Sequence, residues 1–191
     1  MNKYNAQDLA KLELDAAFPF AKAAKIRLLA LDVDGILTDN GLYYDAEGLS
    51  IKRFDCADGV GIKLLQSANI VVALITGMDA AAVARRAATL EITECYHGSL
   101  DKVASMTELM QKYGLGWEEV AYAGDDWMDL PLLRRAGLAL TVSNAQPEVR
   151  ALAHYVSPKE GGRGAVRQLA RHILAAGGRL EALLAPWAFE K

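Results

Sequence analysis

The strongest constraint on the fold is an alternation between short apolar runs and segments with helical periodicity. Between most of the runs lie segments, such as residues 80–90 and 100–114, that place apolar residues on one helix face. Strands that alternate with helices pair in parallel, so the sequence predicts an α/β fold with a doubly wound, mostly parallel sheet covered on both faces. The predicted strands are residues 26–31, 70–75, 94–97, 119–123, 138–141 and 154–156.

A single domain over residues 1–191 is expected, because 191 residues with 52% hydrophobic content can bury one sizeable core. The last predicted helix, near residues 163–176, is followed by Gly177 and Gly178 and then by a short tail, about 178–191. The tail carries several apolar residues, including Trp187 and Phe189, which favours packing on its own subunit or on a neighbour.

One segment departs from the alternation. Residues 41–54, "GLYYDAEGLSIKRF", interleave apolar and polar residues on either side of "DAEG", which is typical of a β-hairpin. A surface hairpin without a role is one reading. Its position directly after a cluster of aspartates favours another, a flap over those carboxylates. Its apolar residues are Leu42, Tyr44, Leu49, Ile51 and Phe54.

Charge and hydropathy argue against several classes of protein. The net charge of −3 gives no field for nucleic acid. The N-terminus does not look like a secretory signal, and the longest apolar run is far below the roughly 20 residues of a membrane span. Cys56 and Cys95 form no metal-binding or disulfide pattern, so a cytoplasmic protein with reduced thiols is expected.

The predicted strands end in residues that suit chemistry. In an open parallel sheet the carboxyl ends of the strands share one edge, where ligands bind. Each polar residue alone could be a helix cap, but together they supply acidic groups, a hydroxyl and an ammonium. The residues expected at this edge are Asp32, Asp34, Thr76, Gly77, Lys102, Asp125, Asp126 and Asp129.

This assortment fits phosphoryl chemistry. A phosphoryl group carries spread negative charge, so its transfer needs positive charge, hydrogen-bond donors and usually a divalent cation. Mg²⁺ between Asp32, Asp125 and a phosphate would turn repelling carboxylates into ligands, and Lys102 and Thr76 would hold the remaining phosphate oxygens. A carboxylate can also attack phosphorus directly and form an aspartyl phosphate.

The motifs "DVDGILTD", the "TG" ending the second strand, Lys102 and "GDDWMD" resemble those of the haloacid dehalogenase superfamily of phosphatases, over residues 28–129. The details "DGVGIKLL", "GDDWMDLPLL" and "GGRGAVRQL" are similar to its subfamily of 3-deoxy-D-manno-octulosonate 8-phosphate phosphatases, over about residues 26–175. The resemblance implies a Rossmann-like fold without a large cap domain, a homotetramer, and a Mg²⁺-dependent sugar-phosphate phosphatase of lipopolysaccharide biosynthesis.

The resemblance also implies roles. Asp32 would be the nucleophile and Asp34 the general acid and base. Asp32, the backbone carbonyl of Asp34, and Asp125 would hold Mg²⁺. The phosphate would bind Thr76, Gly77 and Lys102, and the metal would be supported by Asp126 and Asp129.

The sequence departs from the subfamily at two positions. Met78 stands where an arginine is expected, and Ala57 where a basic residue is common, so the surroundings of an anionic sugar acid lose positive charge. The candidate substrate contacts are Asp58, Lys63, Met78 and Arg163, and each of the two basic residues could equally be a solvated surface side chain.

Three other functions are weighed against this one. A phosphatase for a related nonulosonate or other small sugar phosphate uses the same residues. A phospho-receiver switch has its phosphorylated aspartate alone on the third strand, whereas the acidic pair here opens the set. A non-catalytic oligomeric scaffold would not need every catalytic position intact.

Overall fold

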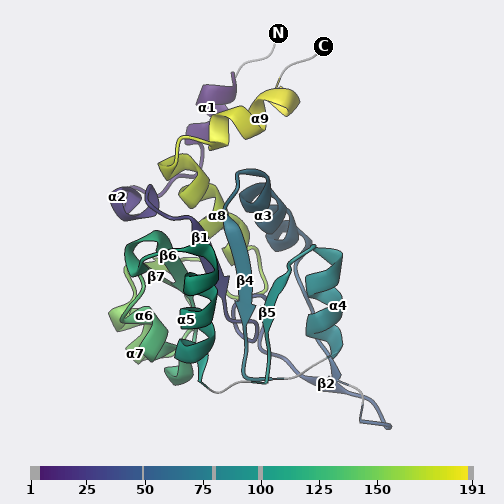
Figure 1. The fold of residues 1–191 in the computed structure, drawn as a ribbon. Helices are drawn as coiled ribbons and strands as arrows, with labels where there is room; N and C mark the ends of the chain where they lie inside the picture. The colour runs from purple at the N-terminus through teal and green to yellow at the C-terminus, as the bar shows by residue number, and fades with distance from the viewer. Residues whose placement is uncertain (1–4, 49, 79–80, 99–100, 189–191) are drawn as a thin grey trace.

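The computed structural model describes residues 5–48, 50–78, 81–98 and 101–188, and a six-stranded parallel sheet forms its centre (Figure 1). The strand order is β5-β4-β1-β6-β7-β8, with every neighbouring pair parallel. The predicted doubly wound sheet is therefore confirmed. The strands are β1 (Leu28–Leu31), β4 (Val71–Ile75), β5 (Glu94–Tyr96), β6 (Val120–Ala123), β7 (Leu138–Val142) and β8 (Tyr155–Ser157).

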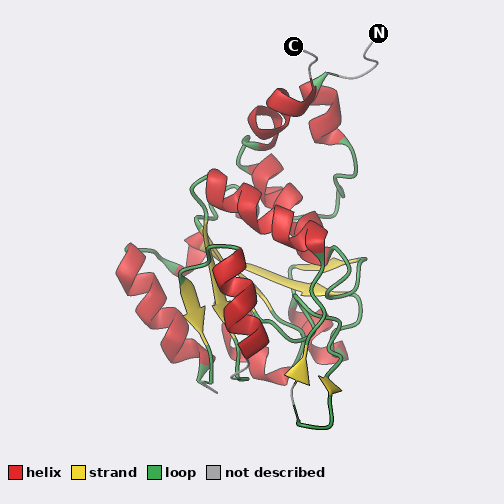
Figure 2. Cartoon of the chain, turned by 90° about the vertical axis from the view of Figure 1, so that its right-hand side faces the viewer, coloured by secondary structure: helices red, strands yellow, loops and turns green. Residues whose placement is uncertain are grey.

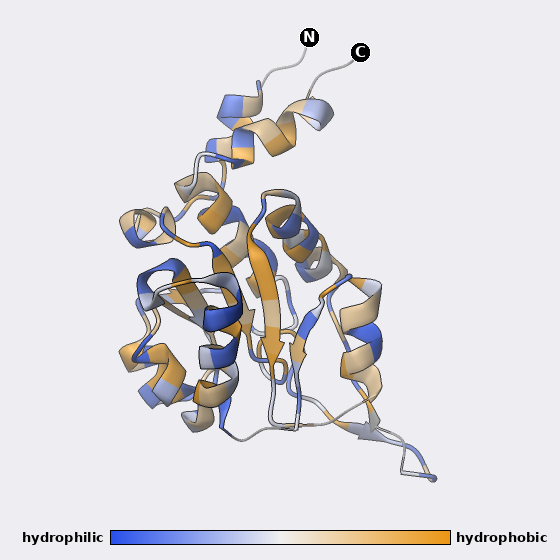
Figure 3. Cartoon of the chain, viewed as in Figure 1, coloured by the Kyte–Doolittle hydropathy of each residue, from blue (hydrophilic) through white to orange (hydrophobic). Residues whose placement is uncertain are grey.

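The central strand β1 explains why the runs are continuously apolar. It pairs with β4 on one side and with β6 on the other, and all four of its residues are fully buried. A parallel strand covered on both faces has no solvent side, so both sets of alternating side chains must be apolar. The inner strand β4 accordingly appears orange along its length (Figure 3).

Helices cover both faces of the sheet (Figures 1 and 2). Right-handed crossovers place α3 and α4 on one face, where α8 packs against α3, and place α5, α6 and α7 on the other. The bounds of these helices are α3 (Cys56–Ser67), α4 (Ala81–Thr89), α5 (Lys102–Tyr113), α6 (Leu130–Leu133), α7 (Pro147–Leu152) and α8 (Ala165–Ala176). Two short 3₁₀ helices, η1 (Trp117–Glu119) and η2 (Trp127–Asp129), flank β6.

The predicted hairpin forms, with short strands. β2 (Tyr43–Tyr44) and β3 (Ser50–Ile51) pair antiparallel, and an isolated bridge between Thr38 and Phe54 closes the base. The hairpin extends from the carboxyl end of the sheet (Figure 1). Leu49, one of its predicted apolar residues, lies outside the described residues.

The two termini meet at the opposite end of the molecule (Figure 1). Helix α1 (Ala6–Lys11) packs against α9 (Leu180–Ala188), which the predicted tail forms and which also contacts α8. Predicted Phe189 falls beyond the described residues. The tail thus packs on its own chain.

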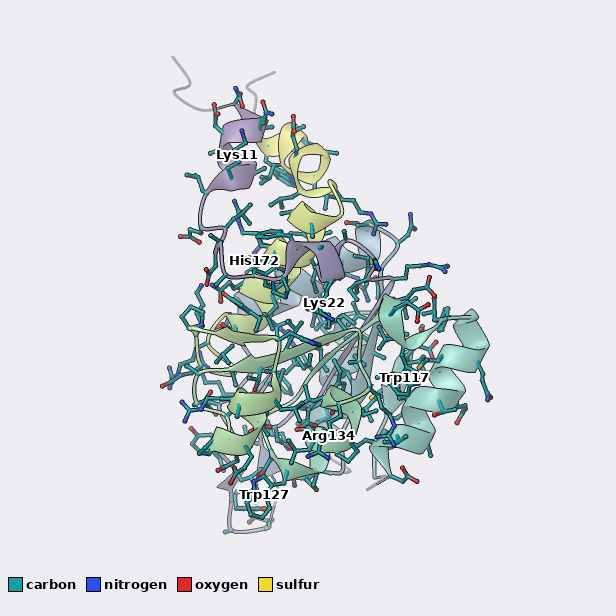
Figure 4. The ribbon with its side chains drawn as sticks, turned by 90° about the vertical axis from the view of Figure 1, so that its left-hand side faces the viewer. Lys11, Lys22, Trp117, Trp127, Arg134 and His172 are labelled. Carbon is teal, nitrogen blue, oxygen red and sulfur yellow. The ribbon has the colours of Figure 1, made fainter. Side chains whose placement is uncertain are left out.

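An N-terminal segment that includes α2 (Phe20–Ala23) is held by a buried histidine of α8 (Figure 4). The His172 Nε2 atom accepts from the Asp15 amide at 2.8 Å, and the ring lies against Phe18 and Tyr155. No sequence pattern predicts this contact, because the partners are 157 residues apart.

Helix α8 begins two residues later than the predicted position 163. Gly162 and Gly164 adopt positive φ angles of 64° and 85°, which only glycine adopts readily and which a helix excludes. Cys56 and Cys95 are not joined in a disulfide. Among the described residues, the helices are all too short or too polar to cross a bilayer.

Candidate active site

The loop after β1 carries two of the predicted carboxylates. The Asp32 amide donates to the Ala123 carbonyl at 2.9 Å, which extends the β1–β6 pairing and fixes Asp32 at the strand end. Asp34 follows two residues later, and its carboxylate accepts from the Thr38 hydroxyl at 3.3 Å. Both carboxylates line one pocket, as their spacing predicted.

The loop after β6 is organised by Asp129, whose carboxylate accepts four hydrogen bonds. One oxygen receives the Lys102 ammonium at 2.7 Å and the Tyr122 hydroxyl at 2.6 Å. The other receives the backbone amides of Asp125 at 2.9 Å and Asp126 at 3.1 Å. These donors occupy Asp129, so its carboxylate shapes the loop while the Asp125 carboxylate is left to face the pocket.

Lys102 is the buried cation of this cluster. It is the first residue of α5, whose N-terminus Asp101 caps by accepting from the Ala104 amide at 3.1 Å. The Lys102 ammonium lies 2.9 Å from Asp32 and 2.7 Å from Asp129. Helix α5 therefore delivers one positive charge between the ends of β1 and β6.

A pocket of about 260 Å³ opens at this edge of the sheet. Its wall on the β4 side is formed by Thr76, Gly77 and Met78, and Asp126 and Met128 lie on the β6 side. Thr76 is buried and its hydroxyl accepts from the Met78 amide at 3.3 Å. The structure thus brings all eight residues predicted from the strand ends to one site.

Burial makes the carboxylates hard to ionise in the absence of a cation. Desolvation, followed by the charge of Asp129, raises the pKa of Asp32 to about 7. Desolvation and the charge of Asp32 raise the pKa of Asp125 to about 8. Burial lowers the pKa of Lys102, but Asp32 and Asp129 together raise it above its usual value. Lys102 alone does not neutralise the cluster.

These residues fit a divalent metal ion. Carboxylate oxygens of Asp32, Asp125 and Asp129 lie within 4.8 Å of one another, and Asp129 is already saturated by hydrogen bonds. Asp32 and Asp125 remain as hard oxygen ligands in a site with excess negative charge. Mg²⁺ takes one or two protein carboxylates together with water and phosphate oxygens, which matches this donor set.

Glycines allow the two acidic loops to approach each other. Gly35 has a φ of 82°, and a Cβ atom there would lie 2.0 Å from an Asp125 carboxylate oxygen. A Cβ on Gly161 would lie 1.8 Å from the Gly35 carbonyl oxygen. A side chain at Gly35 would collide with the Asp125 carboxylate, and one at Gly161 would displace the loop after β1.

Two functional candidates escaped the sequence analysis. Lys52, at the base of the hairpin, is buried and its ammonium lies 2.5 Å from both carboxylate oxygens of Asp34. Tyr122 lies within β6 and donates to Asp129 from beneath the site. A lysine in an alternating hairpin is typical of a solvent-facing residue, and a tyrosine in an apolar run is typical of the core. The sequence marks Lys52 only as a basic residue that lies between the apolar residues Ile51 and Phe54 of the hairpin.

Three predicted substrate contacts, Asp58, Lys63 and Arg163, are not part of the lining of this pocket. Asp58 is buried and accepts from the Gly164 and Arg167 amides, at 3.3 and 2.8 Å, so it caps α8. Lys63 pairs with Glu91 beside a separate hollow of about 640 Å³ that reaches Val71, at the amino end of β4. Exposed Arg163 pairs with Glu160 at 3.3 Å.

Comparison with known proteins gives a consistent set of relatives. A family described as haloacid dehalogenase-like hydrolase matches residues 86–169. The 3-deoxy-D-manno-octulosonate 8-phosphate phosphatase of Escherichia coli strain K12 is 43% identical over 161 residues, which cover 84% of this chain and 86% of that protein.

Solved structures agree with the fold. The corresponding phosphatase of Moraxella catarrhalis, in complex with magnesium, phosphate and KDO, superposes with a TM-score of 0.86 at 39% identity and covers 88% of this chain and 97% of its own. The cobalt-bound enzyme of Haemophilus influenzae gives a TM-score of 0.83 at 38% identity and covers 89% of this chain and 99% of its own.

Proposed function

The chain belongs to the family of 3-deoxy-D-manno-octulosonate 8-phosphate phosphatases among the haloacid dehalogenase-like hydrolases, and on this premise we propose that it is a Mg²⁺-dependent phosphatase of that sugar-acid phosphate. The observation that carries the proposal is the cluster of Asp32, Lys102 and Asp125 at the carboxyl edge of the sheet. It combines a nucleophilic carboxylate, a fixed cation and a metal ligand in one pocket.

Asp32 and Asp34 share the covalent chemistry. An Asp32 oxygen bonds to phosphorus while the bond from phosphorus to the sugar oxygen breaks, and Asp34 donates a proton to that oxygen. Asp34 then takes a proton from water, whose oxygen bonds to phosphorus while the bond to Asp32 breaks. Phosphate leaves and the Asp32 carboxylate is restored.

The remaining site residues would bind Mg²⁺ and the phosphate group and offset the negative charge of the phosphoryl oxygens. The Asp32 and Asp125 carboxylates and the Asp34 backbone carbonyl would hold Mg²⁺, which when bound offsets negative charge on the phosphoryl oxygens. Lys102, the Thr76 hydroxyl and the backbone at Gly77 would bind the other phosphate oxygens. The Asp129 carboxylate holds the Lys102 ammonium in place, and the Asp126 carboxylate accepts a hydrogen bond from the Trp127 amide in the same loop.

The sugar is the less constrained part of the proposal. Met78 lines the pocket and is 39% exposed, so an apolar side chain stands where the subfamily pattern expects a cation. We propose 3-deoxy-D-manno-octulosonate 8-phosphate as the best substrate, because the relatives named for it share about 43% of the sequence. The second candidate is a related nonulosonate or other small sugar phosphate, and the apolar Met78 side chain favours a sugar that needs no cation at this position.

A screen of sugar phosphates for released phosphate, with and without Mg²⁺, tests this function. Preferred hydrolysis of the octulosonate ester in the presence of Mg²⁺ is expected. Preference for a nonulosonate ester would reassign the substrate. Absence of release from every ester would favour the scaffold, and a stable phosphoprotein would favour the receiver-like switch.

We also propose that the active enzyme is a cytoplasmic homotetramer whose sites are closed by hairpins. The hairpin exposes apolar side chains of Leu42, Tyr43, Tyr44 and Ile51, with exposed fractions of 42 to 65%. A two-stranded ribbon is marginally stable alone, so burial of this surface by neighbouring copies supports the assembly.

A further inference from the structure

The two catalytic carboxylates of the proposed mechanism contact different buried lysines. Lys102 contacts Asp32 at 2.9 Å, and Lys52 contacts both oxygens of Asp34 at 2.5 Å. The Lys52 side chain has no exposed surface, whereas that of Asp34 is 19% exposed and faces the pocket. Lys52 therefore lies behind Asp34, and Asp34 stands between Lys52 and the space where substrate binds.

The surroundings of Lys52 leave Asp34 as its main partner. The Lys52 ammonium also lies 3.8 Å from the Met78 sulfur, which is a weak acceptor. A buried ammonium is costly unless it is paired and hydrogen-bonded. The buried Lys52 ammonium is therefore stabilised by pairing with Asp34. Because it contacts both carboxylate oxygens, it fixes the orientation of the Asp34 carboxylate.

The segment that carries Lys52 is itself anchored to the body of the molecule. The Thr38–Phe54 bridge joins the base of the hairpin to the loop after Asp34. Arg53 donates to the Gly162 carbonyl at 2.5 Å. These contacts set the position of residue 52 relative to β1, so the placement of the hairpin and the placement of the Asp34 carboxylate depend on each other.

A second arginine holds the same segment from the helix that follows the phosphate-binding loop. Arg86 of α4 donates to the Asp55 carbonyl at 2.8 Å, and its guanidinium lies 5.6 Å from the centre of the Phe54 ring. The base of the hairpin is thereby held against α4 as well as against the loop that contains Gly162.

We propose that Lys52 is a positioning residue through which the hairpin holds the Asp34 carboxylate in place for proton transfer. The inference rests on the proposed phosphatase function and assigns a role to a side chain outside the pocket lining. It makes general acid and base catalysis dependent on the hairpin, while nucleophilic attack by Asp32 depends on Lys102.

Substrates with different leaving groups distinguish the role of Lys52 in proton transfer from the role of Lys102 in nucleophilic attack. A sugar oxygen needs a proton as it leaves, whereas p-nitrophenolate is stable as an anion and needs little help. Because kcat/KM reports the steps up to the first chemical transfer, Lys52→Met is expected to lower kcat/KM for sugar phosphates by about 10- to 100-fold. For p-nitrophenyl phosphate the expected decrease in kcat/KM is under about threefold. The kcat values of both substrates fall, because Asp34 also activates water in the second step.

Matched variants control the experiment. Lys52→Arg keeps a cation and two donors and is expected to recover most of the lost kcat/KM, which a purely packing role would not predict. Lys102→Met is expected to lower kcat/KM for both leaving groups alike, since Lys102 serves Asp32 and the phosphate. Lys22 is an exposed lysine of α2 that lies away from the hairpin end of the molecule (Figure 4), and Lys22→Met is expected to change kcat/KM for neither leaving group.

Two sugar phosphates distinguish positioning from recognition of substrate charge. Comparable losses for the octulosonate ester and for neutral glucose 6-phosphate support positioning. A loss confined to the anionic sugar acid, or equal losses for sugar and aryl esters, would overturn the inference. If Lys52→Met does not fold, as judged by circular dichroism, the same ratio measured in Lys52→Arg and Lys52→Gln decides. Failure of the wild-type protein to hydrolyse any phosphate ester would instead contradict the proposed function.

Discussion

At the scale of single residues, the carboxylates Asp32, Asp125 and Asp129 outnumber the one cation, Lys102, that the structure describes among them, and this imbalance determines their protonation. Asp32, Asp125 and Asp129 share the Lys102 ammonium, and the pKa values of Asp32 and Asp125 rise to about 7 and about 8. Negative charge that the protein leaves uncompensated is what a divalent cation and a reacting phosphoryl group would require. Two predictions follow from this imbalance and one from the pocket wall.

Replacing the nucleophile should separate activity from folding. Asp32→Asn keeps the shape of the side chain but removes the attacking oxygen anion, so phosphate release is expected to fall by at least about 1,000-fold. Circular dichroism and thermal unfolding should report a native fold, because the neutral amide removes a buried charge. Turnover comparable to that of the wild-type protein would contradict covalent catalysis through Asp32.

Stabilisation by Mg²⁺ should depend on pH. Without metal, burial raises the pKa of Asp32 to about 7 and that of Asp125 to about 8 in the folded chain, whereas in the unfolded chain both carboxyls have their ordinary pKa of 3.8. Their contribution to stability is therefore complete at low pH and is lost as the pH rises through these values. Mg²⁺ binds the ionised form, so its effect on Tm should be larger at about pH 8.5 than at about pH 5.5.

The control for this measurement is NaCl at matched ionic strength. Burial also raises the pKa of Asp58 to about 6, so the Tm difference caused by metal isolates the site better than Tm itself. In Asp125→Asn the metal effect should shrink at both pH values. Equal shifts of Tm at the two pH values in the wild-type protein would count against metal binding by these carboxylates.

Position 78 should tune the choice of sugar. Met78→Arg adds a cation to the pocket wall, so the ratio of kcat/KM for the anionic sugar acid to that for a neutral sugar phosphate is expected to rise by about tenfold, the effect of one charge-assisted hydrogen bond. Met78→Leu is the control for side-chain size. An unchanged ratio in Met78→Arg would mean that residue 78 does not face the substrate.

The residues of the site were predictable where position along the chain determined position in space. Asp32, Thr76 and Asp125 directly follow buried strands, and parallel strands bring their ends together. Lys52 was not predicted and the contacts of Asp58 with α8 were not foreseen, because their partners lie 18 and more than 100 residues away and no local pattern marks such contacts. Asp58 has the residue type of a binding group but serves as the cap of another helix.

At the scale of elements, the "GGRG" segment before α8 supports the site from outside it. Gly161 contacts the Gly35 carbonyl so closely that no side chain fits, and Gly35 in turn contacts Asp125. The segment therefore sets the separation of the two acidic loops. This role follows from backbone contact alone and could not be read from the sequence, where "GGRGAVRQL" contributed only to the resemblance to the subfamily.

Gly161→Ala tests this support. The added Cβ atom has to displace the loop after β1, so we expect destabilisation of roughly 2 kcal/mol together with weaker Mg²⁺ binding. Denaturant unfolding and metal titration measure the two effects. Gly177→Ala is a matched control, because a Cβ there meets its nearest neighbour at 3.6 Å. Retention of wild-type metal affinity in Gly161→Ala would show that the contact does not position the site.

The elements themselves were largely predictable, with exceptions that have physical causes. All six strands lie where they were predicted, and the four inner strands are apolar runs because burial on both faces demands such runs. Helix α1 and helix α9 were not predicted, since each is short and their stability comes from contact with each other. The contact joins the two ends of the chain, which no window of the sequence can report.

At the scale of the whole molecule, the end that carries the hairpin differs in structure from the end where α1 and α9 pack together. Helices α1 and α9 lie beyond the amino ends of the strands, and the hairpin lies at the carboxyl ends (Figures 1 and 2). The pocket is lined by residues that follow the carboxyl ends of β1, β4 and β6. Trp127 lies at the hairpin end (Figure 4), is 63% exposed and donates to Glu148 at 3.0 Å. Exposed apolar side chains near the pocket favour an assembly that forms around the sites.

The assembly gives the last prediction. Light scattering should report a mass of about 82 kDa, four times the chain mass of 20.6 kDa. Replacing Tyr44 and Ile51, which are 65% and 60% exposed, with lysine should dissociate the tetramer, because charges would enter the surface that copies bury. Activity should fall in the same variant, since the hairpin that carries Lys52 would lose the neighbours that hold it.

A lysine at Leu12, 48% exposed and at the far end of the molecule, controls for added charge and should leave mass and activity unchanged. A wild-type protein that is monomeric at micromolar concentration and fully active would refute the assembly. A double lysine variant that is monomeric yet fully active would instead separate assembly from catalysis. The hairpin would then hold Lys52 through the contacts of Arg53 and Arg86 alone.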